Sequence, residues 1–553
     1  MKLNKILALI LAFVMVFSFA ACGNDEPANN VDEPSGDIVI GGGEALANLN
    51  IRKAIGMAFN KQAICDNILR NGSVPADFCI PVGLATGPDG KDYRESSGLT
   101  YNEYDVAEAQ ALWAAGLEEL GLDGVELTVI FDDEEAIKLV AEFIQQELQT
   151  NLAGLTITLQ PYPKKQRSDL MKAHDYDLGL CRWGPDYADP LTYLDLWTDG
   201  YTHNYGNWHS DEYMEILGKI KTVEYATNPE ARWELIKEAE KIIADESVIL
   251  PVYQNCNASL IKSDVEGIEF HAVGLNRVYN NATNADGSAL GVHVTAAIDS
   301  IDPALTSAGD DFEVIGTMVE GLFRCDASGA AIPGMAESYE VDENGTWTFH
   351  LRDAKWSNGD PVTADDFVYA WQRCFTIPAE YVFLFETAGI KNAAAIIAGE
   401  KDVTELGVYA VDDKTLVVEF DVPCAFFDSL MFFPVFYPVN RAFAEECGDL
   451  YGSAPEYYLS NGPFELIEYT PAATEFSMAK NENYWAADEI KIAGLNYKVI
   501  LDSQQAYLAY QNNELDVCVL SSELADLLKT DPEFVATESG YLWYMSPNVS
   551  LGN

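Results

Sequence analysis

The stretch LTVIFDDEEAIKLVAEFIQQELQTNLAGLTITL, residues 127–159, decides the fold class of this chain. Apolar and polar residues alternate at 127–131 and again at 155–159, which predicts two strands. Between these strands, one helix face is marked by apolar residues at positions 137, 140, 141, 144 and 148. Strand, helix and strand in this order form the unit of an α/β sheet, so the sequence predicts an α/β fold.

A third strand is expected at 176–182, and it ends in the turn WGPDYADP at residues 183–190. Gly and Pro beside Trp and Asp favour a tight turn. Sheets of this class place ligand sites at the ends of their strands. This turn is therefore a candidate position for a binding site.

The composition separates the classes of protein that this chain can belong to. Its 553 residues exceed what one hydrophobic core supports, so we expect two or more lobes. A formal charge of -55, from 88 Asp plus Glu against 33 Lys plus Arg, excludes nucleic acid as a partner. The excess carboxylates form a solvated acidic surface, or they steer cationic ligands. Their number also means that carboxylate pairs arise by chance and do not argue for catalysis.

The first 22 residues have the pattern of a targeting segment. Lys2 and Lys5 precede an apolar run from Ile6 to Phe17, and small residues lead to Cys22. This ending resembles the lipobox of bacterial lipoproteins, which predicts Cys22 as the lipid attachment site. The alternative is an ordinary signal peptide with a coincidental cysteine. Residues 23–43 are polar and are expected to form a flexible tether that holds the protein outside the cytoplasmic membrane.

The remaining cysteines and the histidines do not form a recognisable motif. The cysteines have no CxxC spacing, which argues against a metal cluster and against a full disulfide framework. One or two bridges stay open among Cys65, Cys79, Cys181, Cys256, Cys325, Cys374, Cys424, Cys447 and Cys518. Six scattered histidines give no zinc motif, and no phosphate-binding loop is present. We therefore expect no catalytic residue, no metal and no cofactor.

The middle of the chain contains the segment NATNADGSALGV at residues 281–292. It is rich in Gly, Asn, Asp, Ala and Ser and can bury little apolar surface. This composition predicts a flexible connector. The sequence before it resembles the end of a protein, and the sequence after it resembles a beginning.

Nearly the whole chain past residue 22 resembles the family 5 extracellular solute-binding proteins, the oligopeptide-binding lipoproteins of ABC importers. The most specific of the segments that show this resemblance is TWTFHLRDAKWSNGDPVTADDFVYAWQR at 346–373. Others are SIDPAL at 300–305, VEGLF at 319–323, PGMAESYE at 333–340, NGPFEL at 461–466, NENYW at 481–485, LNIRKAIGMAFNKQAI at 49–64, RWGPDYADP at 182–190 and ILPVYQ at 249–254. In that family the SIDPAL-like segment comes first. The reversed order of the halves predicts a circular permutation.

The resemblance implies an α/β, two-lobed periplasmic-binding-protein-like fold of type II, with an extra subdomain. On this basis we expect residues 44–225 with 521–553 to form the ligand lobe of C-terminal type. The N-terminal-type lobe would comprise 226–286, 291–330 and 456–520. Residues 287–290 would link the old termini, and 331–455 would form the extra subdomain.

The same resemblance implies a non-enzymatic, monomeric receptor that binds a peptide between its lobes and delivers it to an ABC permease. Related proteins bind nickel chelates, haem or sugars, so a non-peptide ligand stays open, and a carboxylate-based hydrolase is the remaining alternative. Asp186 matches the family's Asp that pairs with the ligand amino group, and Trp183 would line the cleft. The alternative for Asp186 is a structural cap of its turn. Tyr541 and Tyr544 are further candidates, with an aromatic core as their alternative.

Overall fold

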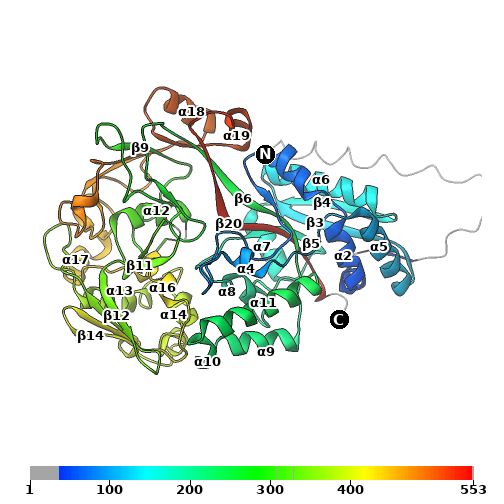
Figure 1. Ribbon diagram of the computed structural model, residues 1–553, viewed down its shortest axis with the longest axis horizontal. Coiled ribbons are helices and arrows are strands. Elements are labelled where there is room, and N and C mark those ends of the chain that lie inside the picture. The colour runs from blue at the N-terminus through cyan, green and yellow to red at the C-terminus, as the bar shows by residue number, and fades with distance from the viewer. Residues whose placement is uncertain (1–36, 41, 307, 328, 551–553) are drawn as a thin grey trace, which may run out of the picture.

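The structure is a computed structural model that describes residues 37–40, 42–306, 308–327 and 329–550. Two lobes lie side by side and are joined by two long strands that run between them, β6 (Leu250–Ile261) and β20 (Phe534–Pro547) (Figure 1). These strands pair antiparallel in the middle of a 12-stranded sheet. Ten of its strands follow the order β1-β3-β5-β20-β6-β19-β9-β18-β17-β16, while β2 pairs with β6 and β4 pairs with β3. One sheet therefore passes through both lobes.

The first lobe is built on the strand-helix-strand unit that the sequence predicts. β3 (Leu122–Asp132) and β4 (Leu155–Tyr162) are parallel, and α6 (Glu135–Asn151) connects them. The buried residues of α6 are those of the predicted apolar face: Ile137, Val140, Ala141, Ile144 and Leu148. β5 (Leu178–Trp183) pairs with β3 on one side and with β20 on the other. The α/β prediction is confirmed for this lobe.

The other elements of this lobe cover the sheet and its edges. They are β1 (Asp37–Ile40), α1 (Gly43–Ala47), α2 (Leu49–Met57), α3 (Lys61–Ala63), β2 (Val74–Pro75), α4 (Tyr93–Ser97), α5 (Val106–Leu120), α7 (Lys164–Lys172), α8 (Leu191–Leu194), α9 (Asp211–Ile220), α10 (Val223–Ala226) and α11 (Pro229–Asp245).

The second lobe contains the other end of the sheet and a separate subdomain. In the sheet, β9 (Leu290–Val294) lies parallel between β19 (Val517–Val519) and β18 (Gly494–Val499), followed by β17 (Glu475–Lys480) and β16 (Phe464–Glu468). Its helices are α12 (Gly309–Met318), α18 (Ser503–Gln511) and α19 (Ser522–Leu528). Short pairs are β7 (Glu269–Phe270) with β8 (Arg277–Val278), and β10 (Phe323–Cys325) with β11 (Ala331–Pro333).

The subdomain is built on an antiparallel sheet of four strands within the segment that the sequence assigned to it. The order is β12 (Ala336–Val341), β13 (Trp347–Leu351), β15 (Thr415–Val418) and β14 (Val408–Asp412). Helices α13 (Ala364–Cys374), α14 (Phe383–Thr387), α15 (Ala393–Ile397), α16 (Phe427–Leu430) and α17 (Arg441–Cys447) complete it.

Two helices lie in a different lobe from the one that the sequence assigned. α11 belongs to the expected range 226–286 of the second lobe, but its Arg232 forms an ion pair with Asp189 next to α8, in the first lobe. α19 belongs to the expected range 521–553 of the first lobe, but its Leu524 packs in a cluster with Ala506 of α18. Sequence continuity does not show where a chain crosses between lobes, and here the crossings occur within β6 and β20.

The segment at 281–292 is a hydrogen-bonded turn rather than the expected free connector. The Thr283 N–H donates to the Glu266 carbonyl at 2.8 Å, and the Glu266 N–H donates to the Thr283 carbonyl at 3.0 Å, which forms an antiparallel bridge. The Gly287 carbonyl accepts from the Ala493 N–H at 3.0 Å, and Leu290, the first residue of β9, is fully buried. Within the turn, the Asn284 side chain donates to the Ser288 carbonyl at 3.2 Å, and the Asp286 carboxylate accepts from the Ser288 N–H at 3.0 Å.

Gly42, near the start of the described chain, and Asn548, near its end, lie beside the same residue, Asp177. The Asn548 N–H donates to the Asp177 carbonyl at 2.9 Å. A Cβ placed on Gly42 would lie 3.3 Å from the Asp177 carboxyl carbon. Gly42 and Asn548 are therefore neighbours, although almost the whole sequence separates them.

Residues 1–36 lie outside the described part of the chain, and with them the predicted signal segment, Cys22 and most of the tether. Among the described residues, no helix is both long enough and apolar enough to cross a membrane. The nine cysteines from Cys65 to Cys518 are all free, and Cys447 alone among them is more than slightly exposed.

Candidate ligand-binding site

The turn after β5 is fastened to the crossing strand β20. The Tyr193 hydroxyl lies 3.0 Å from the Trp183 carbonyl and 2.5 Å from the Gly540 carbonyl. The ring of Tyr541 occupies the space beside Gly184, so any side chain at position 184 would clash with it. Because β20 reaches into both lobes, this turn lies at the junction between them.

Asp186 in this turn carries a carboxylate that has no cationic partner among the described residues. Its backbone N–H donates to Thr192 Oγ1 at 3.0 Å, while the carboxyl group is partly buried. Burial raises the pKa of this carboxyl to about 7. Burial and then the Asp186 charge raise the pKa of the Tyr201 phenol to about 12. Burial and the same charge also raise the pKa of the Tyr381 phenol in the extra subdomain. Asp186 therefore faces the opposite lobe and has an unmet requirement for positive charge.

Next to this carboxylate, two buried polar atoms have no hydrogen-bond partner within the described chain, Trp183 Nε1 and His203 Nδ1. The two rings are in edge contact, with centroids 4.8 Å apart. Burial lowers the pKa of His203 to about 4, so the imidazole is neutral at physiological pH. Buried groups of this kind are costly unless something pairs with them, so both are available to a ligand. His203 is absent from the sequence-based candidates because nothing in its spacing connects it with Trp183.

The two tyrosine candidates on β20 lie in different environments. Tyr541 is 40% exposed and lies over the turn, whereas Tyr544 is 2% exposed and its hydroxyl contacts the Cys181 thiol inside the core. Residues three apart on a strand point to opposite faces, so one strand could not present both rings to a ligand. The structure thus brings Trp183, Asp186 and Tyr541 together. It places Tyr544 in the aromatic core, which was the alternative to ligand contact for this residue.

The lobes touch each other directly beyond Asp186. Tyr187 stacks on Phe426 of the extra subdomain, with ring centroids 4.4 Å apart and planes 6° from parallel. Arg232, which pairs with Asp189 inside the first lobe through hydrogen bonds of 2.7 and 2.8 Å, places its guanidinium 5.7 Å from the centre of the same Phe426 ring. These contacts hold the lobes in a closed arrangement.

A cavity of about 900 Å³ lies between the lobes on the side of Ala188 and Asp189. The first lobe contributes residues 83–88 and the start of α11, and the subdomain contributes residues 425–432. A second cavity of about 300 Å³ adjoins it at Cys325, Ala327 and Phe432. Trp183 and Asp186 do not line either of these two cavities.

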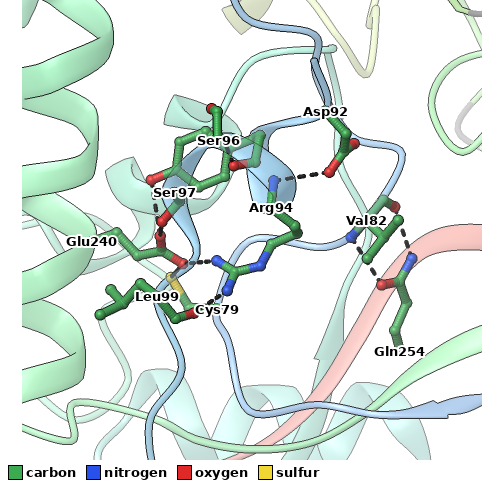
Figure 2. Close-up of polar contacts among 10 residues, drawn as sticks. Cys79, Val82, Asp92, Arg94, Ser96, Ser97, Leu99, Glu240 and Gln254 are labelled. Carbon is green, nitrogen blue, oxygen red and sulfur yellow. Dashed lines mark hydrogen bonds and ion pairs between the residues drawn. The ribbon is translucent and has the colours of Figure 1, made fainter.

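The wall of the larger cavity is supported by a buried polar network (Figure 2). Glu240 of α11 accepts hydrogen bonds from Arg94 at 2.8 Å, from the Tyr93 hydroxyl at 2.9 Å and from Ser97 at 3.0 Å. Arg94 also donates to the Leu99 carbonyl. This fully paired carboxylate fixes the loop that precedes α4, and so the cavity wall is preorganised.

No group of three or more His, Cys, Asp or Glu side chains in the described chain is arranged to hold a metal ion. The geometry instead defines a class of protein: a two-lobed α/β protein with a cavity of ligand-pocket size between its lobes. Its family follows from a sequence comparison. Residues 28–205 and 330–552 match the bacterial extracellular solute-binding proteins, family 5 Middle, which is more than half of the chain. The chain belongs to this family of bacterial extracellular solute-binding proteins.

Several relatives match one part of the chain. The oligopeptide-binding protein OppA of Bacillus subtilis is 33% identical over 263 residues, which is 46% of this chain and 48% of that protein. The dipeptide-binding protein of Lactococcus lactis is 35% identical over 42% of each chain. The structure of Listeria monocytogenes OppA bound to peptide matches with 36% identity and a TM-score of 0.44, over 45% of this chain and 49% of that one. The chain thus spans about half the length of the relatives it matches.

Proposed function

We propose that this protein is an extracytoplasmic receptor that binds peptides with a free amino terminus between its two lobes. The observation that carries the proposal is Asp186, a partly buried carboxylate without a cation, whose pKa burial raises to about 7. A peptide ammonium group would supply the missing charge. Trp183 Nε1 and His203 Nδ1 would pair with polar groups of the same ligand. The names of the relatives, an oligopeptide-binding and a dipeptide-binding protein, support this ligand class.

The proposal includes delivery of the peptide to an ABC permease and anchoring through a lipid on Cys22. Both follow from the family resemblance and from the pattern of residues 1–22, which lie outside the described residues. Membrane fractionation of the protein before and after Cys22→Ala tests the anchor. Release of the variant into the soluble fraction is expected, and unchanged membrane association would contradict it.

The proposal also includes a circular permutation of the family's chain order. The adjacency of Gly42 and Asn548 supports it, because permutation requires that the new ends arise from one cut loop. The test is a reordered chain that joins residue 550 to residue 43 through a short Gly-Ser linker and is opened within 287–290. We expect this chain to melt cooperatively and to bind like the original. A reordered chain that does not fold would refute the permutation.

The ligand class is tested by thermal melts of the protein that begins after Cys22, with and without a mixture of two- to eight-residue peptides. A ligand that binds only the folded state adds about 2.7 kcal/mol of stability at a hundredfold excess over its dissociation constant. An upward shift in the melting temperature with peptides, and none with sugars, haem or nickel chelates, supports the proposal. A shift with one of those other ligands would replace the peptide receptor with a receptor for that ligand, and cleavage of the peptides would replace it with a hydrolase.

A further inference from the structure

The 900 Å³ cavity between the lobes has the size of a ligand pocket, and no ligand role was expected there from the sequence. Its walls combine apolar and aromatic surface with carboxylates. The apolar part includes Leu84, Trp233, Phe270 and Phe426. Such a lining suits an amphipathic group with an apolar stem and a polar end.

The charges of the lining are unbalanced. Six ionisable side chains face the cavity: Asp92, Asp189, Arg232, His271, Asp428 and Glu538. Arg232 is neutralised by its buried pair with Asp189. Asp92, Asp428 and Glu538 form no ion pair with any described residue. Two of these carboxylates accept only backbone N–H groups, from Gly83 and Arg94 for Asp92 and from Ser429 for Asp428. The cavity therefore carries uncompensated negative charge.

A further unpartnered group lies in the same wall. His271 is 8% exposed, and its Nε2 atom has no hydrogen-bond partner within the described chain. Burial lowers the pKa of this imidazole, so it adds no positive charge at neutral pH. A Glu269 carboxylate oxygen lies 3.9 Å from Nε2, beyond hydrogen-bond distance, so this neutral ring nitrogen in the cavity wall is open to a polar group of a ligand.

The position of the cavity relates it to Asp186. Ala188, which lines the cavity, is two residues from Asp186, so their Cα atoms are at most about 7 Å apart. An extended peptide advances about 3.3 Å per residue. The cavity therefore lies within reach of the second or third side chain of a ligand whose amino group pairs with Asp186.

We propose that this cavity binds a cationic side chain, lysine or arginine, at the second or third position of the bound peptide. The inference rests on the proposed peptide-binding function. Asp428 and Glu538, from the subdomain and from β20, pair with the charged group. The Trp233 and Phe270 side chains, which line the same cavity, cover the aliphatic stem.

The test compares tetrapeptides by calorimetry: Ala-Lys-Ala-Ala, Ala-Ala-Lys-Ala and the two counterparts with norleucine in place of lysine. Norleucine keeps the apolar stem and removes the charge. We expect at least one lysine peptide to bind about tenfold more tightly than its norleucine counterpart. The variants Asp428→Asn and Glu538→Gln should each reduce this preference to about threefold or less, with norleucine peptides unaffected. Asp449→Asn, at an exposed position of the same subdomain, is the matched control and should keep the preference.

The outcomes separate the inference from the function on which it rests. Equal binding of lysine and norleucine peptides overturns the inference and leaves the peptide receptor standing. A preference for lysine that survives the double variant Asp428→Asn, Glu538→Gln places the recognition elsewhere and also overturns it. If none of the four peptides binds, the proposed function fails and this inference fails with it. Glu538 is exposed on β20, so its variant keeps the fold even if the Asp428 variant does not.

Discussion

Replacing Asp186 with Asn should have opposite effects on binding and on stability. The peptide ammonium loses its charged partner in an enclosed site, and breaking such a pair costs about 3–5 kcal/mol. At 1.4 kcal/mol per tenfold, the dissociation constant of a free-amine tripeptide should rise at least a hundredfold.

The stability effect follows from the raised pKa. A carboxyl with a pKa raised by burial from 3.8 to about 7 opposes folding by up to about 4 kcal/mol when ionised. Because Asp186 stays partly exposed, we expect Asp186→Asn to stabilise the ligand-free protein by about 2 kcal/mol at pH 8. The free energy of unfolding of the wild type should fall by this amount as pH rises from about 4 to about 7, because the unfolded chain releases the Asp186 proton first. Above pH 7 the carboxyl is ionised in both states and the loss stops. The variant lacks this pH dependence, so the difference shrinks in acid.

Binding should follow the opposite trend with pH. An ammonium ligand favours the ionised carboxylate, so affinity for the wild type should fall about tenfold per pH unit below 7. The assay is calorimetric titration at pH 5.5 and 8 with a tripeptide and with its N-acetylated form, paired with urea unfolding of both proteins. The acetylated peptide should bind weakly to both proteins. Equal binding of the free and acetylated peptides to the wild type, or unchanged affinity in the variant, would refute the role of Asp186.

Three further predictions concern the supports of the site. Asp189→Asn leaves the buried Arg232 guanidinium without its partner and should lower the free energy of unfolding by about 3–5 kcal/mol in urea titrations; a loss below 1 kcal/mol would contradict the buried pair. Glu240→Ala should cost a similar amount, because Arg94 and its neighbours lose their acceptor, whereas an unchanged unfolding midpoint would show that the network is dispensable. Burial lowers the pKa of Lys61 from 10.5 to about 7, so the unfolded chain binds the extra proton and stability should rise between pH 7 and 10. If the free energy of unfolding of Lys61→Met rises between pH 7 and 10 as much as that of the wild type, Lys61 is not the source of the rise.

The α/β class, the repeated strand-helix-strand unit and the family could all be predicted from the sequence. The apolar face of α6 was predicted residue by residue, because a helix that packs on a sheet must present one continuous apolar stripe. The turn at 183–190 was also predictable, since Gly and Pro mark it locally. Its ligand role came from the resemblance and remains a proposal.

What the sequence left open depends on contacts between distant segments. The lobe that α11 joins is decided by Arg232 meeting Asp189, 43 residues away in the chain. His203 becomes a candidate only because its ring lies against Trp183, and Tyr544 leaves the site only because β20 turns it into the core.

The sequence by itself determined local structure, because propensity and apolar periodicity act within one helix or strand. It also determined the acidic balance of the chain, which depends on composition alone. The tertiary structure decided which carboxylates are paired and which are not. Asp186 and Asp189 are three residues apart in one turn. Asp189 pairs with the Arg232 guanidinium, whereas Asp186 has no cationic partner among the described residues. That difference arises from which distant segment packs against each carboxylate, α11 in the case of Asp189, a property that no local pattern encodes.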